Sequence, residues 1–316
     1  RYLSGASEVD VDALCDGQNV HVAGIMEHIE EAGVHSGDSA CALPPYTLAP
    51  AIIGRLSEQT IALAKALNVK GLINIQYAVK GEDIYVLEAN PRASRTVPYV
   101  AKAVGAPIAR IAAKLMADKP LTDFDLQHAN AKRMAVKEAV FPFARIAKVA
   151  PQLGPEMRST GEVMGWDDDF GAAFLKSQIA AGVTLPTEGT VFISLKDSDK
   201  NDVLPAARKL IEMGFSIVAT SGTQRFLSEN GVEAGTVRKV IDGRDNIVDD
   251  MINGKIDLVF TTPEGMQSLK DSKSIRRTAV VNIIPYFTTL SSSVAAVLAI
   301  EVLRTRTLTV RSLQDA

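Results

Sequence analysis

The chain changes its secondary-structure pattern after residue 189, and this change limits the possible folds more than any other feature of the sequence. Beyond it, short apolar segments typical of strands alternate with segments of helical periodicity. The expected strands are 191–195, 215–220, 237–240 and 258–261, and the expected helices are 203–213 and 223–230. Such alternation is typical of an α/β domain with a mostly parallel sheet.

The residues before this change predict a different arrangement. Apolar and acidic residues alternate over 5–25 and indicate a β-hairpin whose turn contains Asp16 and Gly17. Apolar residues at helical spacing predict an amphipathic helix over 48–68, and a helix-rich segment follows over 97–116. This part of the chain therefore mixes strands and helices in the manner of an α+β fold.

Residues 180–189 have the composition of a linker between these two parts. A chain of 316 residues is long enough to form two hydrophobic cores. We therefore expect two domains, residues 1–182 and residues 183–316.

The composition excludes several classes of function. With 34 basic and 37 acidic side chains, the chain has no excess of positive charge for binding nucleic acid or an anionic membrane. The two cysteines, Cys15 and Cys41, lack the spacing of a zinc site or a disulfide framework, so we expect a cytoplasmic protein. No initiator methionine or signal peptide stands at the first residue, so we expect a fragment of a longer protein.

The stretch 72–90 predicts a second hairpin with a turn around Gly81. Alternate residues of a strand share a face. The odd positions, which include Tyr85 and Leu87, are expected to form a buried apolar face. If the loop is centred on Glu82, Gln76 lies opposite Glu88, and Asn74 lies opposite Asn90.

Those even positions bring carboxylate and amide oxygens together, and Mg²⁺ prefers oxygen ligands. We therefore consider Gln76, Glu88 and Asn90 as a metal site, with Arg92 and Arg95 placed to bind a phosphoryl group. The alternative interpretation is that the even face is simply the solvated side of a half-buried sheet.

The string Glu88-Ala-Asn-Pro-Arg92 resembles the metal-binding strand of the ATP-grasp fold, and the resemblance extends over most of the chain to one family. Five motifs, at residues 8–17, 24–30, 32–39, 88–98 and 153–165, resemble carbamoyl-phosphate synthetase large subunits. The match is to the C-terminal part, meaning the C-terminal portion of the second ATP-grasp domain followed by a three-layer α/β methylglyoxal-synthase-like domain.

This resemblance implies phosphorylation of carbamate by ATP with Mg²⁺ or Mn²⁺. It places Gln76, Glu88 and Asn90 on the metal ligands, with Gln76 and Glu88 also near the nucleotide phosphates, and Arg92 and Arg95 on the phosphate-facing arginines. The remaining positions that it assigns to the nucleotide are Arg1, Leu3, Glu8, Gly33, Val34, His35 and Ser36.

The strand-to-helix turn 219–223 could bind phosphate through free backbone amides, although such turns are commonly ordinary helix caps. The region from about 189 onward resembles the methylglyoxal-synthase-like domain, which binds nucleotide effectors in this family. The matching phosphate positions are Lys200, Thr220, Thr223 and Lys239. Relatives often carry Asn-Thr-Thr after the next strand, whereas this chain has Thr261-Thr262-Pro263.

The resemblance also implies partners: a small glutamine-amidotransferase subunit, a nucleotide effector, carbamate and ATP, and a higher oligomer of the heterodimer, in arginine and pyrimidine biosynthesis. Two alternatives stand beside it. One is a regulatory nucleotide-binding module without catalysis, which is what we expect of the isolated fragment. The other is a different ATP-grasp ligase, such as a biotin-carboxylase-like enzyme, against which the five motifs argue.

Overall fold

The computed structural model describes residue 3 and residues 5–126, 131–143, 152–263 and 266–315. The chain divides into two compact units and passes between them more than once. Unit 1 comprises Arg1–Val140, Gly154–Ser177 and Leu308–Ala316, and unit 2 comprises Phe141–Leu153 and Gln178–Thr307. The predicted domain division, 1–182 and 183–316, stays a prediction. Within the described ranges no helix combines the length and apolar character needed to cross a bilayer.

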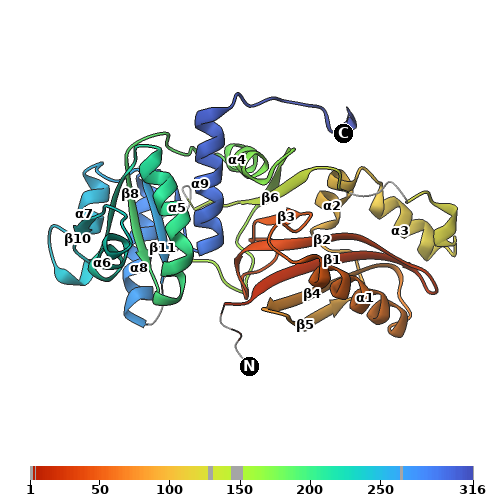
Figure 1. The fold of residues 1–316 in the computed structure, drawn as a ribbon. Coiled ribbons are helices and arrows are strands. Elements are labelled where there is room, and N and C mark those ends of the chain that lie inside the picture. Colours follow the sequence, from red (N-terminus) through yellow and green to blue (C-terminus); the bar gives the residue numbers. More distant parts are fainter. Residues whose placement is uncertain (1–2, 4, 127–130, 144–151, 264–265, 316) are drawn as a thin grey trace. The chain divides into compact units, whose positions relative to one another are not determined.

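Unit 1 contains an antiparallel sheet whose described strands lie in the order β5-β4-β1-β2-β3-β6-β7 (Figure 1). The strands are β1 (Ser7–Asp16), β2 (Val20–Glu31), β3 (Cys41–Leu43), β4 (Lys70–Lys80), β5 (Asp83–Asn90), β6 (Met134–Val140) and β7 (Gly161–Asp167). β1 and β2 pair outward from Cys15 and Val20, which confirms the hairpin predicted over 5–25.

Three helices pack on unit 1's sheet and complete two hydrophobic cores, namely α1 (Pro50–Ala66), α2 (Val97–Val104) and α3 (Ile108–Met116). Helix α4 (Phe170–Ala180) follows β7, and its last residues belong to unit 2. Helices α1, α2 and α3 confirm the helices predicted over 48–68 and 97–116. Val9 and Val11 of β1 share a core with Leu56 of α1, whereas Leu14 shares the other core with Val100 of α2.

The hairpin of β4 and β5 has the predicted pairing at its functional end. Gln76 pairs with Glu88 and Asn74 pairs with Asn90. Nearer the turn, Tyr77 pairs with Val86, because β5 contains a bulge at Leu87. The bulge shifts the alternation, so part of the predicted buried face is wrong.

The side chains of Tyr85 and Leu87 are exposed, with exposed fractions of 37% and 48%, instead of forming a buried apolar face with the odd positions of β4. β5 is also the edge strand of the sheet, so one side of it has no neighbouring strand among the described residues. A bulge commonly re-aims a side chain at the edge of a sheet.

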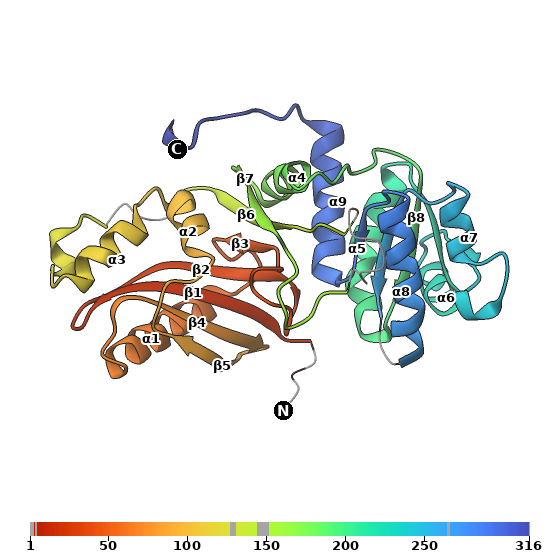
Figure 2. The same cartoon turned by 180° about the vertical axis from the view of Figure 1, so that it is seen from behind.

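Unit 2 contains a parallel sheet whose described strands lie in the order β10-β9-β8-β11-β12. Figure 2 shows β8 of this sheet together with the helices α5 to α9 of unit 2. The strands are β8 (Thr190–Leu195), β9 (Ser216–Thr220), β10 (Gly235–Val237), β11 (Leu258–Thr262) and β12 (Tyr286–Phe287). The helices are α5 (Lys200–Glu212), α6 (Ser221–Glu229), α7 (Ile247–Ile252), α8 (Met266–Val281) and α9 (Leu290–Thr305). The predicted parallel α/β arrangement is confirmed, although the strand expected over 237–240 lies earlier in the chain, at β10.

Candidate functional site

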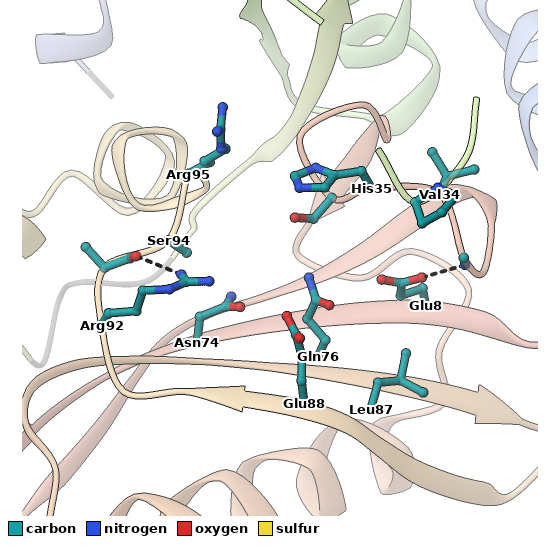
Figure 3. Close-up of a pocket in the computed structure, with 14 residues that line it drawn as sticks. Glu8, Val34, His35, Asn74, Gln76, Leu87, Glu88, Arg92, Ser94 and Arg95 are labelled. Carbon is teal, nitrogen blue, oxygen red and sulfur yellow. Dashed lines mark hydrogen bonds between the residues drawn. The ribbon is translucent and has the colours of Figure 1, made fainter. Parts of the chain in front are cut away.

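Unit 1 contains a cavity of about 770 Å³ at the functional end of the β4–β5 hairpin (Figure 3). Five separate segments line it: β1, the loop after β2, the hairpin, the loop that precedes α2, and the loop that precedes β7. The residues that line it are Glu8, Gly33, Val34, His35, Ser36, Asn74, Gln76, Leu87, Glu88, Arg92, Ala93, Ser94, Arg95 and Pro155. Most of the residues predicted to contact nucleotide or phosphate thus lie around one cavity.

The hairpin supplies the predicted metal-binding oxygens. Gln76 and Glu88 lie side by side and point into the cavity (Figure 3). Asn90 lies outside the described residues that line the cavity, but its Nδ2 donates a hydrogen bond of 2.8 Å to Oε1 of Glu88. Asn90 therefore contacts the site through Glu88, and its own side-chain oxygen is not used in that bond.

Glu8 joins β1 to the loop after β2. Its Oε2 accepts a hydrogen bond of 3.0 Å from the backbone N–H of Gly33, a residue with φ of +99°. Burial raises the pKa of Glu8, whereas His28 and the Gly33 N–H act to lower it. A glycine suits this position because other residues rarely adopt such a φ.

His35 has a defined orientation in the same loop. Its Nδ1 accepts a hydrogen bond of 3.0 Å from the backbone N–H of Gly37. A neutral imidazole that accepts at Nδ1 carries its proton at Nε2. His35 can therefore donate from Nε2 when it is neutral.

Beneath the cavity, β1 carries a row of buried carboxylates. Asp10 lies 2.8 Å from Nε2 of His28, and Nδ2 of Asn74 donates to both Asp10 and Asp12, at 3.2 Å and 2.9 Å. Although burial acts to raise the pKa of Asp10, His28 and Asn74 hold it below its usual value. Because the side-chain nitrogen of Asn74 donates to two carboxylates, its side-chain oxygen is the atom left to interact with a ligand in the cavity.

The two arginines come from the loop between β5 and α2. Arg92 and Arg95 are both exposed and line the cavity. The Arg92 guanidinium donates to the carbonyl oxygen of Ala93 at 3.0 Å, which uses only part of its donor capacity. Cationic and anionic side chains thus face one cavity from different segments, and Figure 3 shows Arg92 and Glu8 at opposite sides of Glu88.

The two remaining predicted nucleotide contacts are Arg1 and Leu3. Arg1 lies outside the described residues. Leu3 is partly buried and is not one of the described residues that line the cavity.

The predicted set of site residues left out several residues that line the cavity, namely Asn74, Leu87, Ala93, Ser94 and Pro155. Asn74 occupies an even position like Gln76, so the alternation of side chains along the strand could have indicated that it faces the cavity. The sequence could not have indicated that Leu87 lines the cavity, because its orientation results from the bulge in β5.

Unit 2 has a cavity of about 300 Å³ near the carboxyl ends of its strands. The residues that line it are Phe192, Ser194, Thr220, Lys239, Val240, Ile241, Ile247, Thr261, Asp271, Ser272 and Ile275. Of the four predicted effector positions, Thr220 and Lys239 line this cavity, and Lys200 and Thr223 do not. Lys200 pairs with Asp197 at 2.6 Å, and the buried Thr223 hydroxyl accepts from the N–H of Leu195 at 3.2 Å.

Comparisons with known proteins agree with this architecture. Residues 1–124 match the family described as "Carbamoyl-phosphate synthase L chain, ATP binding domain", and residues 202–288 match the family described as "MGS-like domain". The carbamoyl phosphate synthase large chain of Mesorhizobium japonicum is 55% identical over 99% of this chain. That of Archaeoglobus fulgidus is 55% identical over 100% of this chain.

The chain spans 27% of the length of the first of these relatives and 30% of the second. A solved biotin carboxylase domain of a single-chain bacterial carboxylase is similar with a TM-score of 0.45 and 20% identity, covering 57% of this chain and 47% of that one. The two family matches follow one another in the predicted order, and the predicted fold class is confirmed. The chain belongs to the carbamoyl phosphate synthase large-chain family and corresponds to the C-terminal part of such a large chain.

Proposed function

We propose that unit 1 contributes to an ATP-dependent phosphorylating site that converts carbamate to carbamoyl phosphate. The observation that carries this proposal is the convergence of the hairpin, Glu8, the 33–36 loop and two arginines on one cavity. The relatives' name, carbamoyl phosphate synthase, supports the choice of product.

Gln76, Glu88 and Asn90 are proposed to hold Mg²⁺ or Mn²⁺. The donor set fits a hard cation, because it offers one carboxylate and amide oxygens and leaves room for water and phosphate oxygens. Among the described residues no group of three His, Cys, Asp or Glu side chains could hold a metal ion, so a cation here depends on the amide oxygens. When bound, the metal neutralises phosphate charge.

The chain's own residues act by positioning and charge. Glu8 and the loop at 33–36 orient the nucleotide, because the Gly33 N–H fixes the Glu8 carboxylate at the cavity wall. Arg92 and Arg95 stabilise charge on the transferring phosphoryl group. The carbamate oxygen bonds to the γ-phosphorus while the bond from that phosphorus to the β–γ bridging oxygen breaks, and ADP leaves with the electron pair. This step requires positioning more than covalent work by the protein.

Unit 2 is proposed to bind a nucleotide effector in the cavity lined by Thr220 and Lys239. Thr223 does not line this cavity but supports Thr220 from the protein interior, because the two hydroxyl oxygens lie 3.5 Å apart. Lys200 donates to the carbonyl of Gly222 at 3.3 Å and supplies positive charge at the start of α6. Helix N-termini and cations favour phosphate binding.

The whole enzyme is proposed to be glutamine-dependent and cytoplasmic, to serve arginine and pyrimidine biosynthesis, and to assemble with a small amidotransferase subunit into a higher oligomer. These parts of the proposal rest on the family resemblance alone.

The test is ATP formation from carbamoyl phosphate and MgADP by a full-length large chain that contains this sequence. We expect Glu88→Gln to lower the rate about a hundredfold or more. The matched control is Glu82→Gln, which makes the same chemical change at an exposed turn of the same hairpin. Equal rates for both variants and the unmodified enzyme would refute the role of Glu88 and leave nucleotide binding by unit 2 as the chain's remaining function.

A further inference from the structure

The buried carboxylate of Asp12 is connected to the loop that carries the two arginines. Oγ of Ser94 lies 2.8 Å and 3.0 Å from the two carboxylate oxygens of Asp12, and Oγ1 of Thr96 donates to Oδ2 at 2.6 Å. Asn74 donates to the remaining side of Oδ1 at 2.9 Å. A carboxylate has enough lone pairs to accept all three donors at once. The side chain of Asp12 is therefore a junction between β1, β4 and the loop.

The position of these contacts in the loop gives them a functional meaning. Ser94 stands between Arg92 and Arg95, and Thr96 follows Arg95 directly. Arg92, Ser94 and Arg95 all line the cavity of unit 1. Fixing Ser94 and Thr96 therefore fixes the backbone from which both guanidinium groups extend.

Thr96 does not use its side chain to cap α2. It is the N-cap residue of α2, a position where threonine hydroxyls usually accept a backbone N–H of the first turn. Here its backbone is helical, with φ of −78° and ψ of −16°, and its side chain makes no hydrogen bond to the helix, whereas its hydroxyl donates to Asp12. The contact with Asp12 is therefore not part of a helix cap.

A charged side chain is also a costly choice for a purely structural junction. Asp12 is completely buried, and burial raises its pKa to about 6 against the hydrogen bonds from Thr96 and Asn74. The same carboxylate orients the side-chain amide of Asn74, whose oxygen is left to interact with a ligand in the cavity. One buried group thus orients two separate parts of the cavity wall.

We propose that Asp12 is a positioning residue, which holds Arg92 and Arg95 at the cavity through the hydroxyl groups of Ser94 and Thr96. The consequence for catalysis rests on the proposed function of unit 1. The consequence for the loop does not, because it concerns only the structure around Asp12.

The loop is tested first, by limited proteolysis of the full chain. Trypsin cleaves after arginine, so cleavage after Arg92 and Arg95 reports how well the loop is held. We expect Thr96→Val, which keeps the shape but removes the hydroxyl, to raise the cleavage rate there about tenfold. Thr96→Ser keeps the hydroxyl and should leave the rate within about twofold. Cleavage after Lys80, the last residue of β4 before the hairpin turn, is the internal reference.

The catalytic consequence is tested by ATP formation from carbamoyl phosphate and MgADP in the full-length large chain. Thr96→Val and Ser94→Ala should each lower kcat about tenfold, whereas Thr96→Ser should retain most of the kcat of the unmodified enzyme. Asp12→Asn should lower kcat no further than the double variant Ser94→Ala/Thr96→Val does, because all of these changes act on one junction.

The outcomes separate the two ideas. If Thr96→Ser is as damaging as Thr96→Val in both assays, the role of Thr96 is packing and the positioning proposal is overturned. If Glu88→Gln leaves activity intact while Thr96→Val still loosens the loop, the proposed function fails and the junction stands. If Glu88→Gln abolishes activity and Thr96→Val changes neither cleavage nor kcat, only the junction fails.

Discussion

Replacing Thr60 by valine should destabilise unit 1 even though valine has nearly the same shape. The side chains of Thr60 and Tyr77 are completely buried, and their hydroxyl oxygens lie 2.9 Å apart. Thr60 belongs to α1, and Tyr77 belongs to β4 beside Gln76. This hydrogen bond therefore joins the helix to the strand that presents Gln76 to the cavity.

The size of the effect depends on which partner is removed. Thr60→Val leaves the buried Tyr77 hydroxyl without a partner, which should cost about 2 kcal/mol. Tyr77→Phe should cost about 1 kcal/mol, because the Thr60 hydroxyl can turn to the carbonyl of Leu56 one helical turn back. The double variant removes both polar groups and should lose about 1 kcal/mol or less, well below the sum of the single changes.

The assay is urea unfolding followed by tryptophan fluorescence. Trp166 is the chain's one tryptophan and is buried in unit 1, so its emission reports the unfolding of that unit. Tyr85→Phe, on the exposed edge strand, is the control for removing a phenol and should not shift the midpoint. A double variant that loses the full sum of about 3 kcal/mol would refute a shared hydrogen bond.

Three further outcomes follow from the same structure. Asp12 has its pKa raised by burial to about 6, so the folded state binds the extra proton between about pH 4 and pH 6 and stability falls as pH rises through that range; Asp12→Asn should flatten this slope in Trp166-monitored unfolding. Burial raises the pKa of Cys41 to about 12, so iodoacetamide at pH 8 should label it only after denaturation, as read by mass spectrometry. Gly165→Ala would place a methyl group against the carbonyl oxygen of Ala173 and should lower stability by about 3 kcal/mol or more, in the same fluorescence assay.

The sequence predicted the hairpin because its constraints are local. Side chains alternate along a strand, and a short turn limits the possible registers, so the pairing of Gln76 with Glu88 followed from position alone. The expected loop centre at Glu82 is wrong near the turn, where Lys80 pairs with Asp83. The bulge at Leu87 restores the expected register beyond it, so two departures cancel at the functional end.

The remaining parts of the cavity could not be predicted from local patterns. Glu8, the loop around His35 and the arginines lie far apart in the sequence, and nothing in their spacing predicts that they meet. Family resemblance supplied that expectation. It did not supply Ser94, whose hydroxyl faces a carboxylate 82 residues away. Contacts of this length depend on the folded topology, which periodicity does not encode.

The two faces of β1 show how unit 1 divides stability and function between neighbouring residues. Val9, Val11 and Ala13 contribute to an apolar core, whereas Glu8, Asp10 and Asp12 between them are buried carboxylates. Burial acts to raise the pKa of all three carboxyl groups. For Asp10 the hydrogen bonds outweigh burial and the pKa is lowered, whereas for Glu8 and Asp12 they offset only part of the cost and the pKa stays raised. Neutral substitutions of Glu8 or Asp12 should therefore remove a cost to folding and weaken the cavity together, as expected where stability and function make opposite demands on a residue.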